Sequence, residues 1–254
     1  MTASYGPLAA WYDALTRDVD YAAFADFYER QFELAGGEMR TLLDLCCGTG
    51  TLTCLLAERG YEMIAADASY DMLMQAREKA AALPSDCVPP LLLCQSAEEL
   101  DLYGTVDAAV CSLDGFDYLQ PEDLPEVLHR LHLFIRPGGL LIFDIRTPES
   151  FEALDGEVFL DETDDVLCLW RADLTDGVMR FGMDLFEREG DLWSRESEEH
   201  VEYVHTPELL TALLQQQGFG EIRTTEDGPQ GDQGRLFFIA TRIDHCAAAT
   251  QGRI

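Results

Sequence analysis

The sequence lacks a long apolar run, a secretion signal and any paired-cysteine motif. No apolar stretch approaches the ~18 residues that a membrane-spanning helix requires. The first residues, MTASYGPLAAWYD, contain neither the basic region nor the apolar region of a signal peptide. The eight cysteines form no C-x-x-C pair, which favours reduced thiols over a disulfide or zinc framework. We therefore expect a cytoplasmic protein with no membrane segment and no metal site.

Basic residues are also scarce. Lysine and arginine number 17 against 48 aspartates and glutamates, so the formal net charge is −31. Because nucleic-acid binding depends on basic side chains that neutralise phosphates, this composition argues against a nucleic-acid partner. The acidity has two interpretations, a solvated surface or a preference for neutral or cationic ligands.

Short apolar segments alternate with amphipathic ones after a helical segment at 8–34. Strands are predicted at 41–45, 61–66, 88–94, 106–112 and 140–145, and helices at 51–59, 70–83 and 122–135. A helix opened by Thr206-Pro207 and the strands 219–225 and 235–241 complete the chain. This alternation predicts an α/β protein whose parallel sheet is covered by helices on both faces. Ligands of such sheets bind beyond the carboxyl ends of the strands.

The sequence pattern changes between residues 157 and 204, where acidic residues are frequent and apolar residues alternate with period two. Met179, Phe181, Met183 and Leu185 fall on one face, and a turn at 189–191 predicts an antiparallel hairpin. We predict an N-terminal helical lid at 1–38, a main domain at 39–150 and 205–243, an antiparallel β insertion at 151–204, and a tail at 244–254.

The strongest chemical signal is the run LLDLCCGTG. It places Asp44 near the end of a strand and Gly48 and Gly50 in the turn that follows, where glycine lets the backbone approach a ligand closely. Asp44 can hold a cationic amino group. Residue 53 is threonine, so the dinucleotide pattern G-x-G-x-x-G is broken. A second acid, Asp67, ends the next strand, where it can accept both hydroxyls of a ribose or cap the following helix.

Three runs resemble the motif series of class I S-adenosylmethionine-dependent methyltransferases: LLDLCCGTG, YEMIAADASYDMLMQAREKA and FIRPGGLLIFDI. LAAWYDALTRDVDYAAF and CSLDGFDYL resemble a bacterial branch of that family with small-molecule acceptors. The resemblance covers nearly the whole chain. It implies a Rossmann-like methyltransferase fold with a mostly parallel seven-stranded sheet, S-adenosylmethionine as the cofactor, and methyl transfer to a small molecule.

In that family the acid of the first strand and the glycine loop bind the methionine part of the cofactor, and the acid of the second strand binds its ribose. An apolar residue, here Met72, packs on the adenine. The acid that usually bonds the adenine amino group is replaced by Ser96, beside which the Ala97 backbone can serve. The cofactor-binding residues implied by the resemblance are Tyr21, Asp44, Cys47, Gly48, Gly50, Asp67, Ala68, Met72, Ser96, Ala97 and Ser112.

Three residues are candidates for catalysis. Asp114 and Asp117 lie in the loop after the fourth strand, which in this family contacts both the methyl donor and the acceptor. Two interpretations are open: these residues position or deprotonate the acceptor, or they cap the helix near Pro121. His200 lies in an E-x-H pattern that resembles the family branch and is either a general base or a structural histidine held by a carboxylate.

Other residues have open alternatives. Cys46 and Cys47 serve as a nucleophile or as packing, with packing favoured. Tyr5, Tyr12 and Tyr21 line a lid over the cofactor or pack in the core, and Trp170 lines a substrate pocket or packs. His129 and His132 are expected on the surface of their helix.

Three competing activities remain at this stage: another transfer from a sulfonium cofactor, a nicotinamide-dependent oxidoreductase, and a cofactor-binding protein without catalysis. The broken third glycine disfavours the oxidoreductase. The sequence specifies neither the acceptor, nor the attacked atom, nor the oligomeric state.

Overall fold

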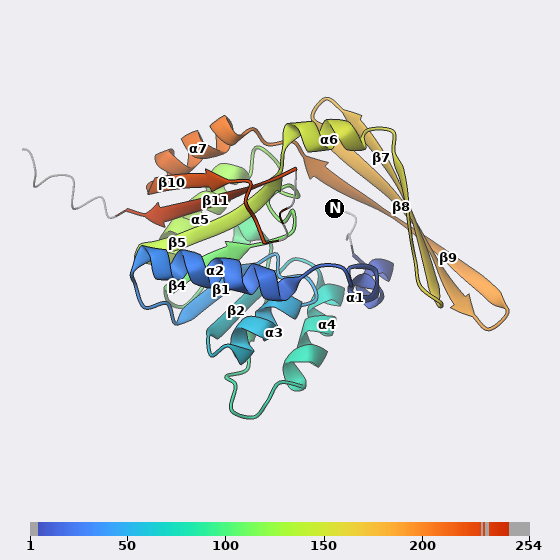
Figure 1. The fold of residues 1–254 in the computed structure, drawn as a ribbon, viewed down its shortest axis with the longest axis horizontal. Helices are drawn as coiled ribbons and strands as arrows, with labels where there is room; N and C mark the ends of the chain where they lie inside the picture. The colour runs from blue at the N-terminus through green and yellow to red at the C-terminus, as the bar shows by residue number, and fades with distance from the viewer. Residues whose placement is uncertain (1–4, 230, 232–233, 244–254) are drawn as a thin grey trace, which may run out of the picture.

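The computed structural model describes residues 5–229, 231 and 234–243, so the predicted tail lies outside them. The larger of two sheets has the strand order β10-β11-β5-β4-β1-β2-β3 (Figure 1). Five neighbouring strands are parallel, β11 pairs antiparallel with β5, and β10 at the edge pairs antiparallel with β11. The predicted mostly parallel seven-stranded sheet is confirmed. Its strands are β1 (Thr41–Leu45), β2 (Glu62–Asp67), β3 (Leu91–Cys94), β4 (Val106–Cys111), β5 (Ile135–Arg146), β10 (Phe219–Thr225) and β11 (Arg235–Arg242).

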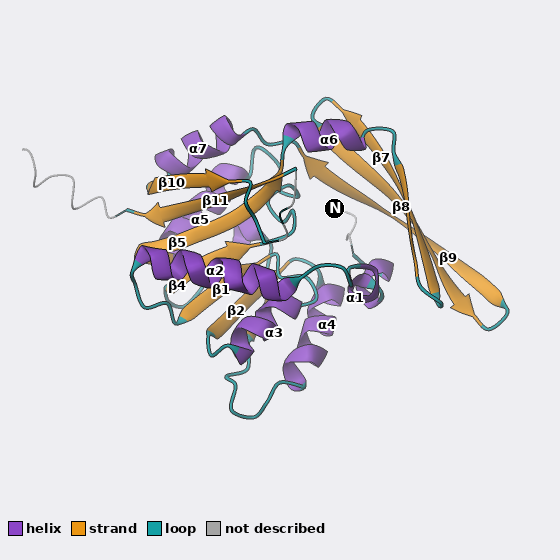
Figure 2. Ribbon diagram, viewed as in Figure 1, coloured by secondary structure: helices purple, strands orange, loops and turns teal. Residues whose placement is uncertain are grey.

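Helices cover both faces of this sheet because its strands are apolar on both sides (Figure 2). Leu42 packs with α2 and α3 on one face, and its neighbour Leu43 packs with α5 and α7 on the other. The helices are α1 (Tyr12–Leu15), α2 (Tyr21–Ala35), α3 (Thr51–Glu58), α4 (Tyr70–Ala81), α5 (Leu124–Phe134), α6 (Pro148–Leu154) and α7 (Pro207–Gln216), with short 3-10 turns η1 (Pro7–Ala10) and η2 (Ala97–Glu99).

The second sheet is antiparallel and has the order β6-β7-β8-β9 (Figure 1). The four residues predicted to share one face of β8 are all buried. Met183 and Leu185 pack with Leu8 and Trp11 of the N-terminal segment, so this sheet and the N-terminus form a joint layer beside the main sheet. Its strands are β6 (Val158–Glu162), β7 (Val166–Thr175), β8 (Val178–Glu189) and β9 (Leu192–Tyr203).

Several predicted element boundaries were wrong. The expected helix over 8–34 is three pieces, since the Asp20 side chain accepts a hydrogen bond from the Ala23 amide and starts a new helix. Strand β3 begins after Pro89-Pro90, which have no amide hydrogen for a ladder. His132 is not a surface residue, because it is half-buried with its ring 5.7 Å from that of Phe219.

The run Pro137-Gly138-Gly139 lies inside β5, which begins at Ile135 and not at Leu140 as predicted. Between the pairs Val106↔Ile135 and Ala108↔Leu140 the register shifts, so the run forms an irregularity in the strand. No helix in 5–229, 231 and 234–243 is long and apolar enough to cross a membrane.

Gly139→Ala is expected to destabilise the fold by about 1–3 kcal/mol, because the irregularity leaves no room for a methyl group. An added Cβ would lie 2.7 Å from Ile135 Cγ2 and closer still to the Asp107 carbonyl oxygen. Chemical denaturation measures the change. Gly104→Ala is the control, since nothing lies within 4 Å of its added Cβ. Equal stability of the two variants would contradict this account of the strand.

Candidate functional site

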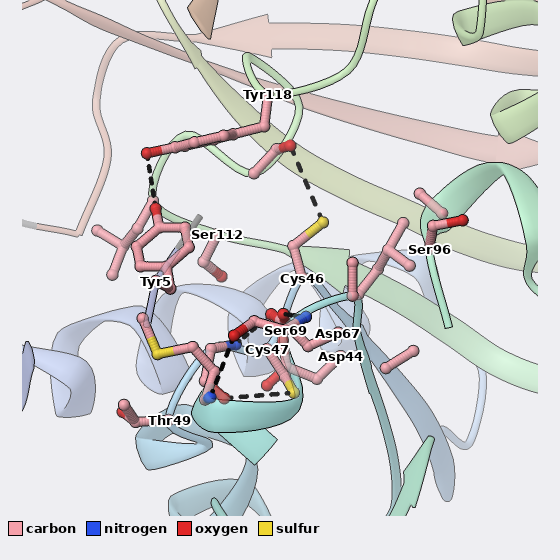
Figure 3. Close-up of a pocket in the computed structure, with 18 of the residues that line it drawn as sticks. Tyr5, Asp44, Cys46, Cys47, Thr49, Asp67, Ser69, Ser96, Ser112 and Tyr118 are labelled. Carbon is pink, nitrogen blue, oxygen red and sulfur yellow. Dashed lines mark hydrogen bonds between the residues drawn. The ribbon is translucent and has the colours of Figure 1, made fainter. Parts of the chain in front are cut away.

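A cavity of about 480 Å³ lies where β1, β2 and β4 end, closed on one side by the N-terminal segment (Figure 3). Its wall includes the residues that directly follow these strands, together with Tyr5, Tyr12 and Tyr21. Carboxyl ends of parallel strands are the usual ligand site of such a sheet. Ten of the eleven predicted cofactor-binding residues line it: Tyr21, Asp44, Cys47, Gly48, Asp67, Ala68, Met72, Ser96, Ala97 and Ser112.

The loop after β1 turns sharply, and its two glycines have different tasks. Cys46, Gly48 and Gly50 all have positive φ angles, of 57°, 53° and 69°. A Cβ on Gly48 would meet no atom within 4 Å and would occupy the open cavity. Gly50 does not line the cavity; a Cβ there would lie 2.7 Å from Ala76 Cβ, so it permits close contact between α3 and α4.

Asp44 is buried and bonded to the residue that breaks the dinucleotide pattern. The Thr53 hydroxyl donates to Asp44 Oδ2 at 2.5 Å. Burial raises the pKa of Asp44 to about 7, although the Thr53 hydrogen bond opposes the shift. The threonine thus fixes the carboxyl group, a role that the sequence pattern did not indicate.

Asp67 holds the glycine loop and keeps acceptor capacity for a ligand. Its Oδ2 accepts from the Gly48 amide and its Oδ1 from the Ser69 amide, both at 2.8 Å (Figure 3). Burial raises the pKa of Asp67 and these two bonds oppose the shift. Each carboxylate oxygen retains a lone pair. The cap of α4 is Ser69, whose hydroxyl accepts from the Met72 amide at 3.3 Å, so the alternative of Asp67 as a helix cap does not hold.

Residues beyond β3 and β4 complete the wall. Ser96 precedes η2 without a side-chain capping bond, and Met72 is buried. Ser112 shares a 2.6 Å hydrogen bond with the Tyr28 hydroxyl. Burial raises the pKa of the Cys47 thiol well above its usual value, which supports the packing interpretation over the nucleophile.

None of the three candidate catalytic residues is among the residues that line the cavity. Asp114 pairs with Arg146 at 2.7 Å and also with Arg235. Burial alone would raise the pKa of Asp114, but the two guanidinium groups hold it below its usual value. Asp117 is fully buried, and burial raises its pKa well above the usual value. Asp114 is therefore a weak base, and burial favours the protonated form of Asp117.

His200 is also fully buried, behind the cavity wall. Its Nε2 atom lies 3.1 Å from Glu198 Oε2, which fits the expectation of a histidine held by a carboxylate. Its Nδ1 atom lies 3.3 Å from the Tyr118 hydroxyl, and Tyr118 does line the cavity. Tyr118 was missed as a site residue, although it belongs to the CSLDGFDYL run. Trp170 packs between the two small cores of the second sheet.

Polar contacts at two places hold the N-terminal segment over the cavity. The amides of Tyr5 and Leu8 donate to Glu198 at 3.0 and 3.1 Å. Asp13 accepts from Thr49 at 2.6 Å and pairs with Lys79 at 2.5 Å. The segment therefore bridges the second sheet and the glycine loop.

Comparisons with known proteins agree on one class. A family model described as a methyltransferase domain matches residues 42–139. A Bacillus subtilis protein named "Putative methyltransferase YqeM" is 29% identical over 94% of this chain and 97% of its own. The crystal structure of an S-adenosylmethionine-dependent methyltransferase from Clostridium acetobutylicum has a TM-score of 0.81 and 26% identity, over 94% of this chain and 99% of that one. The sugar N-methyltransferase KedS8 from Streptoalloteichus has a TM-score of 0.78 and 24% identity, over 92% of this chain and 93% of that one.

Proposed function

Because the chain belongs to the class I S-adenosylmethionine-dependent methyltransferases, we propose that it methylates an amine nitrogen of a small, neutral or cationic molecule. The observation that carries the proposal is the composition of the cavity wall. Asp44, Asp67, Glu98 and Asp123 line it, and none of its described residues is lysine, arginine or histidine. Asp44 and Asp67 are assigned to the cofactor below, so Glu98 and Asp123 are the acids that would favour a cationic acceptor over a carboxylate or phosphate.

The tyrosines at the N-terminal side of the cavity support the same acceptor. Tyr5, Tyr12 and Tyr118 line it, and the faces of tyrosine rings attract ammonium groups. KedS8, which shares the fold, is named as a sugar N-methyltransferase. The acidic chain also disfavours RNA and DNA as acceptors.

The residues of the cavity fit the cofactor. Asp44 would hold its amino group, Asp67 its ribose and Met72 its adenine, while Gly48 leaves open space for close approach. S-adenosylmethionine supplies an activated methyl group on a sulfonium. The protein then has to align the acceptor and exclude water, a contribution of up to ~7–11 kcal/mol to the barrier. The N-terminal segment excludes water on this side of the cavity.

We also propose that different segments of the chain have different roles. Residues 39–150 and 205–243 would bind the cofactor, the segment 1–38 would act as the lid, and the insertion at 151–204 would shape the acceptor end. Behind the cavity wall, the insertion contributes Glu198, which contacts the Tyr5 amide, and His200, which contacts the Tyr118 hydroxyl. The free thiols of the described cysteines support work in the reducing cytoplasm.

The direct test incubates the protein with S-adenosylmethionine and matched acceptor panels: small amines, carboxylates, alcohols, phosphorylated compounds and total RNA. We expect release of S-adenosylhomocysteine with amines only, and mass spectrometry should show one added methyl group on nitrogen. Methylation confined to carboxylates, to hydroxyl oxygens or to RNA would contradict the proposal.

Cofactor affinity is expected to increase with pH up to about pH 7 and then level off. The buried carboxyl group of Asp44 has a pKa of about 7, and only its ionised form attracts an ammonium group. Below this pKa, binding must first release the proton, so Kd should rise by up to about tenfold per pH unit. Calorimetric titration at several pH values measures the effect. Asp44→Asn should bind more weakly with a flat profile, and a wild-type profile in that variant would contradict the assignment.

A further inference from the structure

Four polar side chains lie in contact along a path that leads from the cavity into the second sheet, joined by two hydrogen bonds and one close nitrogen–oxygen contact. The Tyr5 hydroxyl donates to the Tyr118 hydroxyl at 2.6 Å (Figure 3). The Tyr118 hydroxyl lies 3.3 Å from His200 Nδ1, and His200 Nε2 lies 3.1 Å from Glu198 Oε2. The tyrosines line the cavity, whereas His200 is fully buried. Three separate parts of the chain therefore build one polar path: the N-terminus, the loop after β4, and β9.

The hydrogen-bond partners of Glu198 determine the direction in which hydrogens are donated along this path. Its carboxylate also accepts from the Tyr5 and Leu8 amides. Burial alone would raise the pKa of Glu198, but His200 and these amides hold it below its usual value. An ionised Glu198 only accepts hydrogen bonds, so Nε2 of His200 carries the hydrogen and Nδ1 is free to accept from Tyr118. Each donor then points toward Glu198, and the oxygen of Tyr5, which lines the cavity, is the accepting end of the path.

The protein holds Tyr5 in an unfavourable conformation to make this contact. Tyr5 has a φ of 69°, in the left-handed region that side-chain-bearing residues rarely adopt. The same Glu198 carboxylate that faces His200 fixes the Tyr5 backbone. Such strain is found where a side chain must be placed for function. The path is therefore complete only when the N-terminal segment is docked.

Other titratable groups border the path. Glu202 and Tyr12 interact electrostatically with both Tyr5 and Tyr118. Asp114 interacts electrostatically with Tyr118. Burial raises the pKa of Glu202 to about 8, so near neutral pH this group is mostly a neutral acid. Burial also raises the pKa values of Tyr5 and Tyr118, which keeps both as neutral phenols that can pass a proton on.

We propose that Tyr5, Tyr118 and His200 form a proton relay that removes the proton of an ammonium acceptor before methyl transfer and leaves it on His200, beside Glu198. This inference rests on the proposed amine substrate. An ammonium group has no lone pair and cannot attack a methyl group. Its proton passes to the Tyr5 oxygen, the Tyr5 proton to Tyr118, and the Tyr118 proton to His200 Nδ1. The result is a neutral amine and an imidazolium ion paired with Glu198. The amine nitrogen then bonds the methyl carbon, the carbon–sulfur bond breaks, and its electron pair stays on sulfur.

The test compares acceptors that differ in amine pKa. Tyr118→Phe keeps the ring and breaks the relay, so kcat/KM for amines protonated at the assay pH should fall about 100-fold or more. Amines that are already neutral at that pH should lose less than about threefold. Tyr5→Phe should show the same split. Tyr61→Phe, whose hydroxyl contacts Glu29 away from the cavity, is the matched control and should leave all rates unchanged.

An equal fall in kcat/KM for all amines in the Tyr118→Phe and Tyr5→Phe variants, or no fall, would overturn the relay. Glu202→Gln should keep the wild-type dependence of kcat/KM on amine pKa. Loss of that dependence would show that Glu202, and not His200, is the terminal proton acceptor, and it would also overturn the relay. Nitrogen-15 NMR of the imidazole gives a readout apart from turnover. Nε2 should carry the hydrogen in the wild type, and an Nδ1-protonated His200 would refute the direction of the relay. If the wild type methylates no amine, the proposed function fails instead.

Discussion

Asp67→Ala is expected to weaken S-adenosylmethionine binding at least about 100-fold while the protein stays folded. A carboxylate that accepts two ribose hydroxyls makes two charge-assisted hydrogen bonds, each contributing roughly 1.5–3 kcal/mol. Their loss amounts to about 3 kcal/mol or more, and about 1.4 kcal/mol corresponds to a tenfold change in Kd. The Gly48 amide also loses its 2.8 Å partner, so the glycine loop is less well ordered for the ligand. Isothermal titration calorimetry gives Kd directly.

Two further variants separate ribose binding from loop support. Asp67→Asn keeps an oxygen for one amide but loses the charge, so its affinity should fall between those of the wild type and the alanine variant. Asp71→Ala, an exposed acid in the first turn of α4, is the control and should bind normally. An unchanged Kd in Asp67→Ala would remove Asp67 from the cofactor site.

Arg235→Met is expected to lower the free energy of unfolding by about 3–5 kcal/mol, because it leaves the buried Asp144 carboxylate without its cationic partner and Asp114 with Arg146 alone. The guanidinium group of Arg235 pairs with Asp114 and, at 2.6 Å, with Asp144. Asp144 is fully buried and Asp114 is nearly so. Burial raises the pKa of Asp144 even with the arginine present, so removal of Arg235 should favour the protonated acid still more. Chemical denaturation at neutral pH measures the loss.

A matched substitution on the surface controls for the change of side chain. Arg180→Met removes an exposed pair with Glu199 at 3.5 Å and should cost no more than about 1 kcal/mol. Adding Asp144→Asn to Arg235→Met should restore part of the stability, since one buried charge then disappears. A loss below about 1 kcal/mol for Arg235→Met would show that the arginine does not compensate these carboxylates.

The amino-acid sequence determined the main sheet and most of the proposed cofactor side of the site. Apolar runs such as 42–45, followed by glycine turns and amphipathic helices, specify their own secondary structure, because that preference is local in the chain. Parallel strands bring their carboxyl ends to one edge, so Asp44, Gly48 and Asp67 could be placed together from their positions alone. The predicted methyltransferase class is confirmed by the relatives.

The tertiary structure alone decided the proposed acceptor side and the internal electrostatics. Glu198 meets the Tyr5 amide across 193 positions of sequence, and Arg235 meets Asp114 across 121. Such contacts depend on how the second sheet and the N-terminal segment pack against the main sheet, which no local periodicity encodes. The contact of Tyr118 with Tyr5 follows from the same packing, whereas the pairing of Thr53 with Asp44 and the irregularity at Gly139 arise inside the main sheet and its helices. A side chain's neighbours, unlike its secondary structure, are often set by distant segments, and this is why the arginine partners of Asp114 and the contact of His200 with Tyr118 emerged only from the folded chain.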